Sequence, residues 1–171
     1  MIRRVAFKKA ILAGVLGAVS WEIVMRGLIL LGLPMFDLVH ALGTLLLGVT
    51  APNWQWWPVG MILHASVGAI WAIFYAYFFW SFFDYPPVIQ GMIFSLLPAV
   101  LAGLIMVPQL DFMNESILAG RLTKNGIFAS GVGWGGPTAV ILGHLVYGIV
   151  LGYLYQRPVG YAVGRQVVKY D

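Results

Sequence analysis

Six polar side chains in this sequence have the chemistry to bind a ligand within otherwise apolar segments. They are Glu22, Arg26, Asp37, His64, Asp111 and His144. Two histidines with two aspartates can bind a divalent metal, with the carboxylates as ligands or as partners that orient the imidazoles. Two neutral imidazoles alone can ligate a haem iron from both sides. The same groups suit a proton relay or a polar-substrate site, and the simplest alternative is a histidine that hydrogen-bonds a neighbouring helix.

The two histidines occupy matching positions in a repeated pattern. The residues of one copy, followed by those of the other, are Trp54, His64, Gly68 and Tyr75, then Trp134, His144, Gly148 and Tyr155. Upstream, Asp37 and Asp111 each follow a proline by three residues. Two related helix pairs would explain these matches, and chance similarity in an apolar sequence is the alternative. The predicted metal site contains His64, His144, Asp37 and Asp111, and the predicted haem site contains the two histidines.

A second candidate is the pair formed by Glu22 and Arg26, which lie one helical turn apart in an apolar run. The acid precedes the base, which is the favoured order for an ion pair within a helix. A lone charge at the centre of a membrane span costs about 2.5–3.5 kcal/mol on the insertion scale. We therefore predict an intramembrane ion pair, which either holds the first helix to its neighbours or belongs to a proton or substrate path.

The elements that carry these residues are predicted to be membrane helices. Of the 171 residues, 61% are hydrophobic and 9% are charged, whereas a soluble domain carries about 25% charged residues. A bilayer core of about 30 Å requires roughly 20 apolar residues to cross. The sequence predicts an all-α membrane protein of one domain, residues 1–171, with a four-helix bundle whose spans cover residues 10–33, 59–82, 88–107 and 138–155.

Two further segments are predicted to lie outside the bilayer core. Residues 36–49 are too short to cross and predict an interfacial or re-entrant helix. Residues 108–137 contain several charged or polar side chains and predict an external loop. Pro98 and Pro108 are expected to kink or end the third span. Every span carries small residues four apart, a spacing that predicts close helix packing.

The basic residues predict the orientation. Seven lie on the two tails and two lie in the loops that would face the other side: Arg3, Arg4, Lys8, Lys9, Arg157, Arg165 and Lys169, against Arg121 and Lys124. The positive-inside rule then places both termini of this multi-pass protein in the cytoplasm. The basic residues form no stripe with interleaved aromatics, so nucleic acid is not an expected partner.

The order of elements resembles that of small YagU-like bacterial inner-membrane proteins. The resemblance rests on a basic start, a first span ending in Leu-Pro-x-x-Asp, a proline-containing third span and the closing sequence Gly143-His144-Leu145-Val146. It covers most of the chain, and it implies a topology rather than an activity or a set of site residues.

Two functional hypotheses follow. The sequence has no cysteine and no recognisable catalytic motif, so the first is a non-enzymatic bundle without a cofactor. This bundle would act by contact, as an accessory or scaffold subunit of a membrane complex or as a small homo-oligomer, with the lipid bilayer and other membrane subunits or its own copies as partners. The alternative is a small transporter, or a protein that binds haem or a divalent metal through the His/Asp set near the outer face.

Overall fold

The predicted all-α membrane bundle is confirmed. The computed structural model describes residues 5–48, 53–80, 85–120 and 123–156. Four helices in these ranges are long and apolar enough to cross a membrane: Phe7–Leu30, Trp54–Phe79, Pro87–Met113 and Gly135–Leu154. Three of the predicted spans differ from these helices by a few residues at each end, as expected for helix termini placed from hydropathy.

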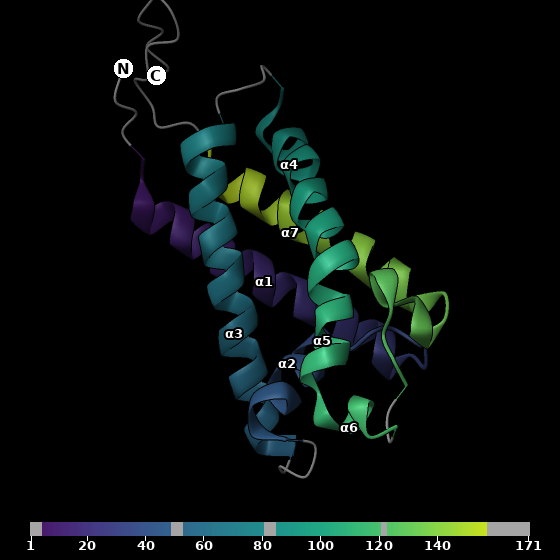
Figure 1. Ribbon diagram of the computed structural model, residues 1–171. Helices are drawn as coiled ribbons and strands as arrows, with labels where there is room; N and C mark the ends of the chain where they lie inside the picture. The colour runs from purple at the N-terminus through teal and green to yellow at the C-terminus, as the bar shows by residue number, and fades with distance from the viewer. Residues whose placement is uncertain (1–4, 49–52, 81–84, 121–122, 157–171) are drawn as a thin grey trace, which may run out of the picture.

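The elements follow one another in the order shown by Figure 1. They are α1 (Phe7–Leu30), α2 (Leu38–Leu47), α3 (Asn53–Phe74) with its continuation η1 (Tyr75–Phe79), α4 (Pro87–Leu101) with its continuations η2 (Ala102–Met106) and α5 (Val107–Met113), α6 (Glu115–Leu118), η3 (Ile127–Val132) and α7 (Gly135–Leu154).

The short helix predicted after the first span is α2. Its ten residues extend about 15 Å at 1.5 Å per residue, which is too short to cross a bilayer. The carboxylate of Asp37 caps its start by accepting a hydrogen bond from the backbone N–H of His40 at 2.9 Å. Gly43 of α2 and Gly60 of α3 let the two helices touch, since a side chain at either glycine would collide with the partner backbone.

The predicted end of the third span at residue 107 is wrong, as is the description of residues 108–137 as one loop. The helix continues through Pro108 to Met113, and α6 and η3 lie in the remainder. The segment η2 is a π-helix, in which each N–H bonds to the carbonyl five residues earlier. Pro108 is the second residue of α5, where the helix returns to α geometry after the π-helical segment.

The four spans form two layers. Figure 1 shows α1 and α7 passing behind α3 and α4. Glycines make the two main crossings between the layers: Gly14 of α1 meets Gly68 of α3, and Gly91 of α4 meets Gly148 of α7. At each crossing a Cβ on either glycine would collide with the carbonyl of the other. Backbone contact of this kind is how membrane helices gain packing energy where lipid supplies no hydrophobic drive.

The first and last spans begin and end on the same side of the bundle. The Tyr155 hydroxyl accepts a hydrogen bond from the backbone N–H of Ala6 at 3.3 Å, and its ring lies 6.1 Å from that of Tyr75. Four crossings return the chain to the side where it started. The basic residues Arg3, Arg4, Arg121, Arg157, Arg165 and Lys169, which carry most of the predicted orientation, lie outside the described residues.

Candidate functional site: a cavity between α3 and α4

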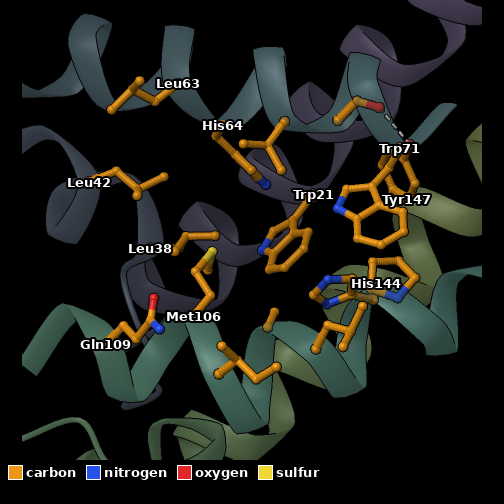
Figure 2. Close-up of a pocket in the computed structure, with 16 residues that line it drawn as sticks. Trp21, Leu38, Leu42, Leu63, His64, Trp71, Met106, Gln109, His144 and Tyr147 are labelled. Carbon is orange, nitrogen blue, oxygen red and sulfur yellow. Dashed lines mark hydrogen bonds between the residues drawn. The ribbon is translucent and has the colours of Figure 1, made fainter. Parts of the chain in front are cut away.

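Trp21 brings the two predicted histidines together. Its indole lies 4.8 Å from the imidazole of His64 and 4.5 Å from that of His144, both measured between ring centroids. All three side chains are buried, and Figure 2 shows Trp21 between His64 on α3 and His144 on α7. Gly143 makes room for the indole, because a Cβ there would overlap the Trp21 ring. Both histidines of the repeated sequence pattern therefore contact the same aromatic side chain.

The two imidazoles differ in their hydrogen bonds. Nδ1 of His144 lies 2.7 Å from the backbone oxygen of Val140. Since a carbonyl only accepts, Nδ1 carries the proton and Nε2 of the neutral ring is left as an acceptor. Nδ1 of His64 is buried and has no hydrogen-bond partner among the described residues. A buried polar atom without a partner costs about 1–3 kcal/mol, so this nitrogen is an unsatisfied polar group inside the bundle.

These three residues form the floor of a cavity of about 420 Å³, within the range of about 300–1,000 Å³ that small-molecule sites occupy. Its walls come from both layers and are almost wholly apolar. Besides the floor, they consist of Leu38, Leu42, Leu63, Val67, Gly68, Trp71, Pro98, Leu101, Ala102, Ile105, Met106, Gln109 and Tyr147.

The cavity opens towards the surroundings of the bundle, between α3 and the α4–η2 segment. The side chains at its rim are exposed, among them Val67 at 42% and Ile105 at 50% of their surface. In a membrane helix such faces contact lipid chains rather than water. Tyr147 closes the inner end by donating a hydrogen bond from its hydroxyl to the Gly68 carbonyl at 2.7 Å.

The predicted ion pair is present and has a third member. Glu22 accepts from Nη2 of Arg26 at 2.7 Å, and Asp37 accepts from Nη1 of the same guanidinium at 2.8 Å. The indole N–H of Trp57 also donates to Glu22 at 3.2 Å. The cluster thus ties α1 to the start of α2 and to α3, close to one end of the bundle.

The structure does not bring the four residues of the predicted metal site together. Asp37 is held by Arg26, while Asp111 accepts hydrogen bonds from Asn125 and from the backbone N–H of Gly126. Within the described ranges, no three His, Asp or Glu side chains are grouped closely enough to hold a metal ion. Asp111 instead fastens the segment between α6 and η3 to the end of the third span.

The predicted haem site does not fit the observed packing. A haem between two axial histidines needs its porphyrin plane where both imidazoles face each other. Here the buried indole of Trp21 contacts both imidazoles.

Sequence reasoning missed Trp21 and Asp37 in their observed roles. One signal for Trp21 was present: a tryptophan in mid-span is unusual, because these side chains gather at the membrane interfaces. The partnership of Asp37 with Arg26 depends on the turn between α1 and α2, which hydropathy does not specify.

No protein family, curated protein or solved structure matches this chain.

Proposed function

We propose that this protein binds a lipid-soluble small molecule, which enters sideways from the bilayer between α3 and the α4–η2 segment. The observation that carries the proposal is the cavity of about 420 Å³ with apolar walls, an exposed apolar rim and two imidazoles on its floor. Binding sites for small molecules commonly combine an apolar lining with a few placed polar groups. The ligand is uncharged, because no charged side chain among the described residues lines this cavity to offset the ligand's desolvation.

Photolabelling tests the proposal. The probe is decanol carrying a diazirine near its hydroxyl, applied to the protein in lipid nanodiscs, with labelled residues identified by mass spectrometry. We expect saturable labelling of Leu63, Leu101 and Met106, which line the cavity, and its loss when excess decanol is added. Ile23 and Ile149 are exposed outside the cavity and should be labelled without saturation. Equal, non-saturable labelling of both groups would contradict a binding site.

The predicted contact function stays a prediction. The described helices offer lipid-facing surfaces, and they identify no protein partner. Purification in a gentle detergent followed by mass measurement tests this hypothesis, since an accessory subunit or a homo-oligomer would be heavier than one chain. A strictly monomeric particle would count against it and would leave the cavity proposal unaffected.

We further propose that the chain arose by duplication of a helix pair and that it lies in a bacterial inner membrane with cytoplasmic termini. Support for the duplication comes from the glycine crossings: Gly68 and Gly148 occupy equivalent positions in the repeated pattern, and each meets a glycine of its own half. Support for the orientation comes from the basic tails. The resemblance to YagU-like proteins agrees with this topology.

A further inference from the structure

The polar groups on the cavity floor are covered or engaged within the protein. The Trp21 indole packs against both imidazoles, and His64 and His144 are only 6% and 7% exposed. Nδ1 of His144 is held by a backbone carbonyl of its own helix, and the Tyr147 hydroxyl donates to a backbone carbonyl of α3. The polar group of a ligand is therefore bound elsewhere in the cavity.

Among the polar side chains that line the cavity, only that of Gln109 on α5 belongs to an exposed residue. No hydrogen bond joins its amide to another described side chain. An amide carries both N–H donors and a carbonyl acceptor, so it can bind the hydroxyl or amide group of a ligand in either direction.

Gln109 lies where the hydrocarbon core of the bilayer ends. The third span, Pro87–Met113, has 27 residues and is about 40 Å long at 1.5 Å per residue. The hydrocarbon core is about 30 Å thick, so a centred span extends about 5 Å beyond it at each end. Gln109 precedes the end of this span by four residues, or about 6 Å, which places its amide at the boundary between lipid chains and head groups.

The rest of the cavity leads from this boundary towards the middle of the bilayer. Figure 2 shows Gln109 beside Leu42 at one end of the cavity, with Trp71 and Tyr147 at the other. Pro98 also lines the cavity and lies eleven residues before Gln109, about 16 Å along the helix. The cavity is therefore an elongated apolar space with an accessible amide at its head-group end.

Resting on the proposed function, we propose that the ligand is an uncharged amphiphile, with a hydroxyl or amide head group on an alkyl chain, and that Gln109 binds the head group. The alkyl chain extends from Gln109 along the apolar walls towards Trp71. The ligand enters from the leaflet on the side of α2 and α6. A hydrocarbon without a head group fills the same space and leaves the amide of Gln109 unused.

The test compares decanol with decane as competitors of the decanol diazirine, with the protein in nanodiscs and saturable labelling of Met106 as the measurement. Competitor concentrations are expressed as mole fractions in the lipid, so that partitioning from water does not affect the comparison. We expect decanol to halve the labelling at a mole fraction about three- to tenfold lower than decane does, which corresponds to the net free energy of one hydrogen bond.

Gln109→Met tests the anchor, because methionine keeps an unbranched side chain of similar length and removes the amide. We expect this variant to reduce the advantage of decanol over decane by about the same three- to tenfold factor. Gln55→Met is the matched control: Gln55 lies near the start of α3 and outside the cavity lining, so the advantage should be unchanged.

The outcomes separate this inference from the proposed function. If decanol does not displace the probe from Met106, both proposals are overturned. If decanol displaces the probe and Gln109→Met leaves its advantage over decane unchanged, the cavity binds lipid-soluble molecules and the anchor is wrong. Equal displacement by decanol and decane in the unmodified protein would overturn the anchor without any variant.

Discussion

Among single residues, Arg26 is the cation that balances the two carboxylates of the ion-pair cluster. Its guanidinium holds two carboxylates from different elements, those of Glu22 and Asp37. Glu22 is nearly inaccessible, with 8% of its side chain exposed. A buried carboxylate that loses its cation keeps its desolvation cost without the compensating attraction.

Replacement of Arg26 should therefore destabilise the protein strongly. We expect Arg26→Gln to lower the free energy of unfolding by about 3 kcal/mol, measured by thermal or denaturant unfolding in detergent. Arg26→Lys should fall between this variant and the unmodified protein, since lysine keeps the charge and loses the forked geometry. Lys8→Gln, at an exposed position of the same helix, is the control. If Arg26→Gln unfolded at the same temperature as the unmodified protein, a structural role for the cluster would be refuted.

The chemistry of single residues was only partly predictable from the sequence. The Glu22–Arg26 pair follows from helical spacing alone, because residues four apart share a helix face. The meeting of His64 and His144 was a consequence expected from the repeat. The partners of Asp37 and Asp111 could not be predicted, since both are determined by turns whose path depends on tertiary packing. The result is that the aspartates hold the structure together, while the histidines line the cavity.

At the scale of elements, the glycine crossings determine how closely the helices approach. Gly91 of α4 and Gly148 of α7 touch through their backbones, and a Cβ at position 91 would collide with the Gly148 carbonyl. Rigid backbone cannot move aside as a flexible side chain can, so even one methyl group forces the helices apart.

Gly91→Ala is therefore expected to cost about 1–3 kcal/mol of stability, the usual range for overpacking. Gly27→Ala is the matched control: Gly27 is also helical, and among the described residues no atom outside its own turn lies within 4 Å of the added Cβ. There the greater helix propensity of alanine should leave stability unchanged or raise it by up to about 1 kcal/mol. Equal effects of the two substitutions in a thermal unfolding assay would show that the crossing does not limit packing.

Helices were more predictable than the connections between them. Runs of apolar residues located all four spans, because crossing a bilayer imposes length and hydropathy together. The continuation from Pro108 to Met113 was missed, since a proline normally ends a helix and the π-helical segment before it has no signal in hydropathy. The opening between α3 and α4 was also missed, because hydropathy does not distinguish a helix face that contacts lipid from one that lines a cavity.

At the scale of the whole molecule, four crossings place the start of α1 and the end of α7 on one side. The hydrogen bond between Ala6 and Tyr155 joins them directly, and α6 lies towards the opposite end of the bundle in Figure 1.

Cysteine labelling tests this topology, and the natural chain has no cysteine to interfere. Single cysteines replace Lys8, Gln156 and Glu115 in turn and are treated with a membrane-impermeant maleimide in intact spheroplasts and in inverted vesicles. We expect Lys8→Cys and Gln156→Cys to react only in inverted vesicles, and Glu115→Cys only in spheroplasts. Labelling of positions 8 and 156 from opposite sides would contradict a four-span bundle. Labelling of both from outside would reverse the proposed orientation alone.

In the function proposed for this protein, the space between α3 and the α4–η2 segment holds a lipid-soluble ligand. Two tryptophan substitutions on α3 test it most directly: Val67 lines the cavity rim, whereas Ile62 is exposed outside the cavity. The measurement is saturable labelling of Met106 by the decanol diazirine. We predict that Val67→Trp abolishes the labelling by filling the entrance and that Ile62→Trp leaves it intact. Undiminished labelling in Val67→Trp, with both variants folded, would contradict the claim.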